Sequence, residues 1–374
     1  MEPRQVTAML TPAQRLAWLR LMRSDNVGPV TFRQLLNRFG SAEAALEALP
    51  AFSRKTGRAL HIASQAQAED EIAGLSRYGA RLVAQGEALY PPHLIHIAGA
   101  PPLLTIAGGD RLDWQRTVGI VGARNASSAG MKMTRILAAD LGARGYSVVS
   151  GLARGIDSAA HLASLATGTI AALAGGLDCI YPPDNIPIAH DILDNGGALL
   201  TEMPLGWEPR ARDFPRRNRL VSGLSLGVVV IEAAKRSGSL ITARLALEQN
   251  RDVFAVPGSP LDPRAEGGNA LIQQGARLVT NADDIVETLG SADPARSALF
   301  DPEWRPEPAL PDAAPDESDR ARLVSALSTT PIEVDELIAQ TGIAPGAMQM
   351  LLLELDLGGR IEWSSGQLVA LRYS

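Results

Sequence analysis

Blocks of apolar and polar residues alternate along the middle of the chain. From Thr117 to about Leu289, short and almost wholly apolar runs are separated by stretches in which apolar residues recur every three or four positions. Such runs are typical of strands covered on both faces, and such stretches are typical of amphipathic helices. The alternation predicts an α/β fold with a doubly wound, mostly parallel sheet. The expected strands are 118–122, 146–151, 169–176, 198–203, 226–233, 252–258 and 276–280.

A helical pattern precedes this block. Thr11 followed by Pro12 is the signature of an N-cap and a first helical residue. The turn at 27–30 resembles that of a helix-hairpin-helix or SAM-like module, whose backbone amides can face a DNA phosphate. A helical bundle with ordinary caps explains the same residues equally simply. We expect a helical domain over 1–85, with short strands at 79–86 and 102–108 on the edge of the sheet that follows.

The composition changes again after the block. Residues 291–317 are rich in Pro, Ala, Asp and Glu, which predicts a linker because such a segment cannot bury a core. Residues 318–374 contain three helical segments and two β-like pieces, the outline of a winged helix. Its third helix, within 346–359, has no Lys, Arg or Asn, so we expect it to pack against protein rather than read DNA bases. The α/β core then occupies 86–290.

Composition narrows the class of protein. The 374 residues are 46% apolar and contain one cysteine, Cys179, so a large core and a reducing, cytoplasmic compartment are expected, with no signal peptide or membrane span. The net charge of −6 weighs against general binding of polyanions. A nucleic-acid site must then be a concentrated patch. One candidate is the segment 207–219, which has five arginines and two carboxylates.

The first two strand-to-helix loops combine glycine with arginine. In parallel sheets, ligands bind beyond the carboxyl ends of the strands, and glycines there let the backbone approach a phosphate. Tight turns alone explain the glycines, but not an arginine in each of two successive loops. The spacing is not G-x-G-x-x-G, and the second strand ends without the carboxylate that holds a ribose, which argues against NAD. The candidate phosphate contacts are Gly122, Arg124, Ser127, Arg154 and Gly155.

Two later segments add candidates. A Ser-Gly-Ser turn opening a helix is a nest for anions, or alternatively an ordinary N-cap; it contributes Lys235, Ser237, Gly238, Ser239 and Thr242. Another helix begins at Pro215 and carries four consecutive cationic or polar residues, Arg216, Arg217, Asn218 and Arg219. Consecutive helical positions point in different directions, so we expect one or two of these arginines to be structural.

Signs of catalysis are few. The five histidines show no metal-ligand spacing, and the chain has no G-x-S-x-G motif. Asp157 and His161 fit the roles of a helix cap and a packing residue. Glu232, at a strand end, is the best candidate for a general base, but the sequence offers it no partner. We expect no enzyme activity, no metal and no cofactor.

The motifs taken together resemble the DNA-processing protein A family (DprA, also called Smf). They include VGIVGARNASSAG, SGLARGIDSAAH, FPRRNRLVSGLS and VVVIEAAKRSGSLITARLALEQNR, and run in order from residue 118 to residue 276. The resemblance implies an extended Rossmann-like core with the family's helical domain and winged helix. It also implies phosphate contacts at Arg124 and Arg154, in the 216–219 cluster and in the Ser-Gly-Ser nest. Many relatives have a lysine where Pro183 stands here, so we expect another cation to make that contact.

The family's roles follow from the resemblance alone. They are homodimerisation, binding of single-stranded DNA without sequence specificity, protection of incoming DNA in natural transformation (competence), and loading of the RecA recombinase in DNA recombination. The alternative is a nucleotide-binding phosphoribohydrolase-like enzyme, because such enzymes have a similar core with a Gly-Gly-x-Gly-Thr nest. Here the nest reads Ser-Gly-Ser-Leu-Ile-Thr, and paired catalytic Arg and Glu residues are not evident.

Overall fold

The computed structural model describes residues 9–56, 59–290, 315–364 and 368–372. Contacts divide the described chain into two compact units, one formed by 71–290 and the other by 9–70 together with 315–372. Most of the predicted linker, 291–314, lies outside the described residues.

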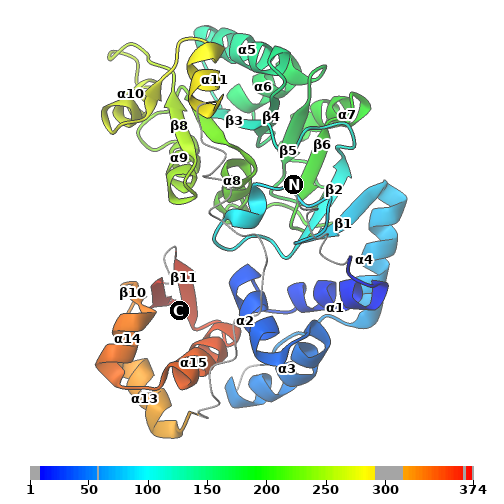
Figure 1. Ribbon diagram of the computed structural model, residues 1–374, viewed down its shortest axis with the longest axis vertical. Coiled ribbons are helices and arrows are strands. Elements are labelled where there is room, and N and C mark those ends of the chain that lie inside the picture. Colours follow the sequence, from blue (N-terminus) through cyan, green and yellow to red (C-terminus); the bar gives the residue numbers. More distant parts are fainter. Residues whose placement is uncertain (1–8, 57–58, 291–314, 365–367, 373–374) are drawn as a thin grey trace, which may run out of the picture. The chain divides into compact units, whose positions relative to one another are not determined.

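The first unit is built on a nine-stranded sheet with the order β1-β2-β6-β5-β4-β3-β7-β8-β9 (Figure 1). The strands from β6 to β9 are parallel, whereas β2 runs antiparallel to β6 and to β1. The predicted mostly parallel α/β sheet is therefore confirmed, and both extra N-terminal strands lie at its edge. The strands are β1 (Ala80–Ala84), β2 (Leu103–Gly108), β3 (Thr117–Gly122), β4 (Ser147–Ser150), β5 (Thr169–Ala172), β6 (Ala198–Thr201), β7 (Gly227–Ile231), β8 (Asp252–Ala255) and β9 (Arg277–Leu278).

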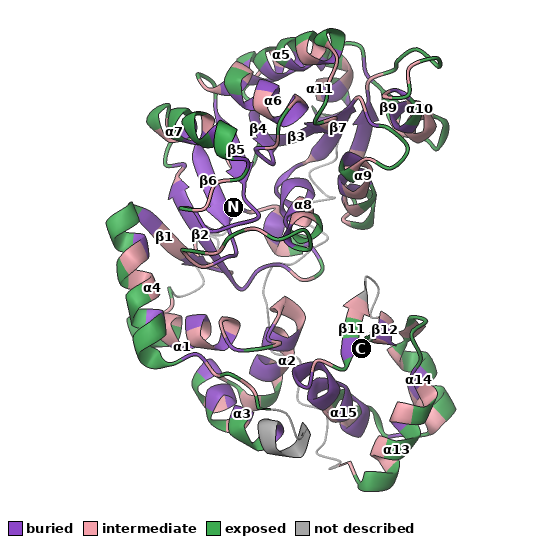
Figure 2. Ribbon diagram, turned by 180° about the vertical axis from the view of Figure 1, so that it is seen from behind, coloured by how far each residue is buried: buried purple, intermediate pink, exposed green. Residues whose placement is uncertain are grey.

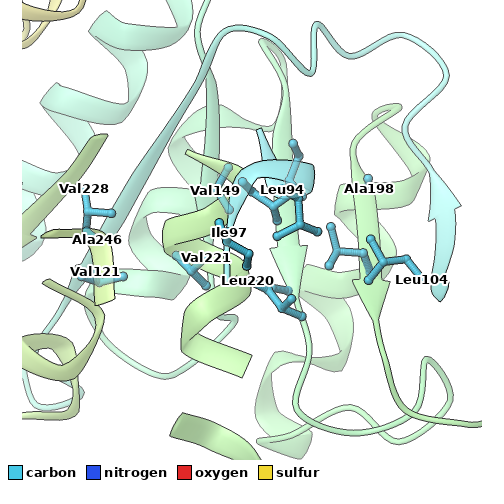
Figure 3. Packing of buried hydrophobic residues seen from close by; sticks show 14 of the residues in the cluster. Leu94, Ile97, Leu104, Val121, Val149, Ala198, Leu220, Val221, Val228 and Ala246 are labelled. Carbon is cyan, nitrogen blue, oxygen red and sulfur yellow. The ribbon is translucent and has the colours of Figure 1, made fainter. Parts of the chain in front are cut away.

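Helices cover both faces of this sheet. Strand residues alternate between two apolar clusters: Val229 faces the cluster formed with α5, α6 and α11, and Val228 faces the one formed with α8 and α9. Figure 3 shows the second cluster, where Leu220 of α8 packs near Leu94 of a 3₁₀ turn. The elements are η1 (Leu94–His96), α5 (Ser128–Ala143), α6 (Ile156–Ser164), η2 (Pro183–Asn185), α7 (Ile186–Asp194), α8 (Asp213–Leu224), α9 (Gly238–Glu248), α10 (Glu266–Gln273) and α11 (Ala282–Gly290).

The strand order reverses between β3 and β7. From β3 the chain moves outward through β4, β5 and β6, and then returns to place β7 on the other side of β3. Loops that leave two neighbouring strands in opposite directions open a crevice at their carboxyl ends. The loops after β3 and β7 flank this switch point.

The second unit joins the two ends of the described chain. Its N-terminal part contains α1 (Pro12–Met22), α2 (Pro29–Phe39) and α3 (Ala42–Thr56), followed by α4 (Gln65–Tyr78), which continues into the first unit. Thr11 caps α1 in a capping box with Gln14, as its sequence predicts. The C-terminal part is a winged helix made of α13 (Glu317–Ala326), β10 (Ile332–Glu333), α14 (Val334–Thr341), α15 (Pro345–Leu357), β11 (Ile361–Ser364) and β12 (Leu368–Leu371).

Helix α15, the third helix of the winged helix, packs against the N-terminal helices. Leu353 and Leu357 belong to the same apolar cluster as residues of α1, α2 and α3. The hydroxyl of Thr31 donates to the carboxylate of Asp356 at 2.6 Å, and both residues are buried. Figure 2 shows α15 as mostly buried, which confirms the predicted packing role.

Among the described residues, no helix has both the length and the apolar character needed to cross a bilayer.

Candidate nucleic-acid interface

The loops after β3 and β4 lie against each other. The amide of Ile156 donates to the carbonyl of Ala123 at 3.2 Å, and a Cβ on Gly155 would lie 2.3 Å from the same oxygen. A Cβ on Gly122 would lie 1.9 Å from the carbonyl oxygen of Ile231 in β7. Gly122 and Gly155 therefore have a packing role, since they allow loops and strands to approach closely. This packing brings the loops that carry Arg124 and Arg154 together.

Arg124 forms a cluster with two aromatic residues, in which Arg124 and Tyr181 are exposed and Phe214 is half-buried. Its guanidinium carbon lies 5.5 Å from the centre of the Phe214 ring, at the start of α8. That ring meets the Tyr181 ring edge-on, with 5.5 Å between centroids, and Tyr181 is 51% exposed. Within the described residues, Arg124 makes no ion pair. This cluster of Arg124, Phe214 and Tyr181 offers a cation beside π faces, the combination that suits a nucleobase and its phosphate.

Sequence reasoning did not select Phe214 and Tyr181. Each stands beside a residue that did attract attention, since Phe214 opens the FPRRNR motif and Tyr181 precedes two prolines. Aromatic side chains next to arginines at strand ends were the available signal.

Arg154 and Arg216 are exposed cations with exposed or distant partners. Arg154 pairs with Asp184 at 2.5 Å, and both side chains are more than 60% exposed. The Nε of Arg216 lies 3.8 Å from Glu202, and its side chain is 42% exposed. The exposed pair of Arg154 and Asp184 contributes little to stability, so a phosphate can replace Asp184 at small cost, whereas the partner of Arg216 is a buried carboxylate. Asp184 lies in η2, next to Pro183, so its pair with Arg154 places a cation close to the position of the family's lysine.

Arg217 lies inside the core instead of at the surface. It is 6% exposed, and its guanidinium donates to the carbonyl of Ala172 at 2.6 Å and to that of Gly151. Burial lowers its pKa to about 10, although the carboxylate of Asp157 acts in the opposite direction. Arg217 thus ties α8 to the ends of β4 and β5, so a DNA backbone does not reach it. The helical phase at this position turns the side chain inward.

Arg219 and Asn218 also serve the scaffold. Arg219 donates to the carbonyl of Gly99 at 2.7 Å and pairs with the buried carboxylate of Glu202. The side chain of Asn218 donates to the carbonyl of Gly238 at 3.4 Å, which links α8 to the start of α9. Arg217 and Arg219 are therefore the structural members that the sequence led us to expect among the three arginines.

Hydroxyl groups of the Ser-Gly-Ser turn form some of the hydrogen bonds that its polar groups could otherwise offer to a ligand. Ser237 caps α9, and its hydroxyl lies 2.6 Å from that of Ser239. Ser239 and Thr242 are buried, at 6% and 2% exposed, so they face the protein rather than solvent. Gly238 borders open space, and Lys235 is 83% exposed, with its amine 3.8 Å from Glu266. Only Lys235, Ser237 and Gly238 of the five predicted residues present a surface to a ligand.

Ser127 holds a carboxylate of the protein itself. Its amide donates to Glu232 Oε2 at 2.7 Å, and its hydroxyl donates to Oε1 of the same side chain. The hydroxyl also accepts from the amide of Gly130 at 3.0 Å, so Ser127 is the N-cap of α5. The expectation that Ser127 is open to phosphate is corrected here, since an internal anion fills that place. Glu232, which seemed unpartnered in the sequence, has Ser127 as its partner.

Asp157 and His161 are both structural, as predicted, but the expected capping role of Asp157 is wrong, because Gly155 is the N-cap of α6 and Asp157 lies in its first turn. Asp157 is buried and accepts from the amides of Gly151 and Ala153 at 3.1 and 3.3 Å, and burial raises its pKa. His161 is fully buried, with Nδ1 2.7 Å from the hydroxyl of Thr169. Neither reaches solvent. No group of His, Cys, Asp and Glu that suits a metal ion occurs in the described part of the chain.

Comparison with known proteins agrees with this architecture. The family model for DNA recombination-mediator protein A matches residues 81–290. The chain belongs to the DprA/Smf family. The models of the DprA-like N-terminal HHH domain and the DprA winged helix domain match 12–74 and 306–367.

Relatives span most of the chain. Protein Smf of Escherichia coli is 39% identical over 311 residues, covering 81% of each chain. The DNA processing protein DprA of Bacillus subtilis is 47% identical over 193 residues, covering 50% of this chain and 65% of that one. Among solved structures, DprA of Streptococcus pneumoniae aligns with a TM-score of 0.57 at 32% identity, covering 75% of this chain and 98% of that one. DprA of Helicobacter pylori, whose structure is described by its single-stranded DNA binding mode, aligns with a TM-score of 0.51 at 30% identity, covering 56% and 95%.

Proposed function

We propose that this DprA-family protein binds single-stranded DNA without sequence preference at the carboxyl edge of the core sheet, as a DNA-processing protein in natural transformation. The observation that carries the proposal is the cluster of Arg124, Phe214 and Tyr181. Every base has a π face, so stacking on aromatic rings tolerates any sequence, while nearby cations follow the backbone. The family relative from Helicobacter pylori, with its described single-strand binding mode, supports the same reading.

The cluster favours a single strand over a duplex. Bases in a duplex are stacked on one another, so their faces are not available to an aromatic side chain. Exposed cations at Arg154, Arg216 and Lys235, in the loops after β4 and β7 and on α8, can provide further charge for phosphates. An acidic protein can hold DNA in this way because affinity depends on local neutralisation of phosphates.

The further family roles belong to the same proposal. We infer that the protein is a cytoplasmic, non-enzymatic homodimer that protects the bound strand and loads RecA onto it. Against the phosphoribohydrolase alternative, the carboxylate of Glu232 is engaged by Ser127 and is not directed at a substrate. Incubation with AMP is expected to release no free base.

Fluorescence anisotropy with labelled oligodeoxythymidine and a matched duplex tests the proposal. Arg124→Ala is expected to weaken binding to all sequences and to reduce the slope of log affinity against log salt by about 0.7, the value for one phosphate on a single strand. Phe214→Ala removes a stacking face worth about 1–3 kcal/mol per base and is expected to weaken binding about fivefold or more. Arg144→Ala is the matched control, because Arg144 pairs with Asp283 at the far end of α5. Unchanged binding by both site variants would refute the proposed interface.

A further inference from the structure

Glu232 has an unusual backbone conformation at the end of β7. Its φ angle is 51°, in the left-handed region that favours glycine and that few other residues adopt. Conformations of this kind persist only where the surrounding structure imposes them, and they concentrate at functional sites. In Glu232, this conformation directs the side chain from β7 across the switch point to the loop after β3.

The neighbouring residues are arranged around this carboxylate. Ser127 binds it with both its amide, at 2.7 Å, and its hydroxyl. A Cβ at Gly130 would lie 2.5 Å from the carboxyl carbon and 2.7 Å from each oxygen. The missing side chain at position 130 therefore makes room for the carboxylate. The left-handed backbone, the two-point hydrogen bonding and the glycine all accommodate one internal anion.

The Glu232 carboxylate occupies a position that binds phosphate groups in other doubly wound folds. It lies at the N-terminus of the helix that follows the first parallel strand, beside the switch point. In doubly wound folds this is the place where the pyrophosphate of a dinucleotide binds, because helix amides and the helix dipole attract negative charge. With Glu232 present, a second anion meets both a filled space and a like charge.

We propose that Glu232 is a specificity-determining residue, an internal anion that keeps free nucleotides out of the switch point and reserves the adjoining cluster for polynucleotide chains. The inference rests on the proposed function, because single-stranded DNA is taken as the occupant of the cluster of Arg124, Phe214 and Tyr181. A strand that crosses the loop tips does not need the N-terminus of α5. A free nucleotide needs the N-terminus of α5, because that is where its terminal phosphate or pyrophosphate would bind.

Isothermal titration calorimetry with ADP and with inorganic pyrophosphate tests this assignment on the full chain. Glu232→Gly removes the carboxylate, and glycine adopts the left-handed backbone without strain, so this variant is expected to fold. Glu232→Gln is the matched control, because its amide fills the same space. Glu232→Gly is expected to bind ADP at least tenfold more tightly than the wild type, and Glu232→Gln, which removes the charge but keeps the space filled, is expected to gain clearly less than Glu232→Gly. ADP is expected to displace labelled oligodeoxythymidine from Glu232→Gly only.

Equal ADP affinity in the wild type and in Glu232→Gly would overturn the inference. So would ADP binding by Glu232→Gln as tight as that by Glu232→Gly, because the side chain would then not occupy the site. Binding of oligodeoxythymidine to the wild type is measured in parallel. If the wild type does not bind oligodeoxythymidine, the proposed function is refuted. If the wild type binds it strongly but has the same ADP affinity as Glu232→Gly, only the role of Glu232 is refuted.

Discussion

The buried imidazole of His161 makes the core sheet sensitive to acid. The hydroxyl of Thr169 donates to the carbonyl of Val148 at 3.0 Å, so it accepts from His161 Nδ1, which therefore carries the proton. Nε2 is buried without a hydrogen-bond partner among the described residues. A second proton would thus be placed in an apolar setting near the charge of Arg217. Burial first, and then Arg217, lower the pKa of His161 to about 3.

The consequence for stability has a definite sign. The folded pKa lies below the ordinary value of 6.5, so the unfolded chain takes up a proton below pH 6.5 that the folded chain does not accept. Stability that is fully present above pH 6.5 is then lost as the pH falls towards 3. Each pH unit well inside this window costs about 1.4 kcal/mol, so acidification from pH 6.5 to 4.5 costs about 2 kcal/mol through His161 alone, because the unfolded imidazole is already half protonated at pH 6.5.

His161→Gln provides the comparison, because glutamine also carries a donor but does not titrate. Native-state hydrogen exchange at β4 and β5 gives the free energy of opening of this sheet at several pH values. Carboxylates titrate in both proteins, so they cancel in the difference. Between pH 6.5 and 4.5, the wild type is expected to lose about 2 kcal/mol more of its opening free energy than the variant loses. Parallel curves for the two proteins would refute the assignment of a neutral, buried imidazole.

Three other substitutions test the scaffold, one of them as a control. Arg217→Met leaves the buried carboxylate of Asp157 without its cation, so it is expected to lower the free energy of unfolding in urea by about 3 kcal/mol. Arg216→Met, on the exposed neighbour, is expected to change this free energy by less than about 0.5 kcal/mol. Equal effects of the two substitutions would contradict the placement of Arg217. Burial raises the pKa of Asp356, so the wild type is most stable with this group protonated and loses stability as the pH rises through the raised pKa. Asp356→Asn, which retains an acceptor for Thr31, is expected to be more stable than the wild type at pH 7 in thermal melts, and a benefit that persists below pH 3.8 would contradict the account.

The sheet and its loops were predictable because they depend on local patterns. Apolar runs such as 226–233 leave little choice except a buried strand, and parallel strands place their following loops on one edge. The candidate loops could therefore be assigned before their geometry was known. The same holds for α15, whose lack of cationic residues indicated packing.

The details of the site depended on contacts between distant residues. Ser127 and Glu232 are separated by 105 residues, and no local pattern indicates that the N-cap of α5 binds the Glu232 carboxylate. Consecutive arginines at 216 and 217 look alike in sequence, and only the packing of α8 on the sheet decides which one is buried. The assembly of the two chain ends into one unit is likewise a tertiary property.

Photo-crosslinking tests the central claim most directly. Oligodeoxythymidine carrying 5-iodouracil at single positions is bound to the full chain and irradiated, and the crosslinked peptides are identified by mass spectrometry. A base stacked at the carboxyl edge of the sheet is expected to crosslink to Tyr181 or Phe214. Crosslinks confined to the turn at 27–30 or to the winged helix would contradict the claim.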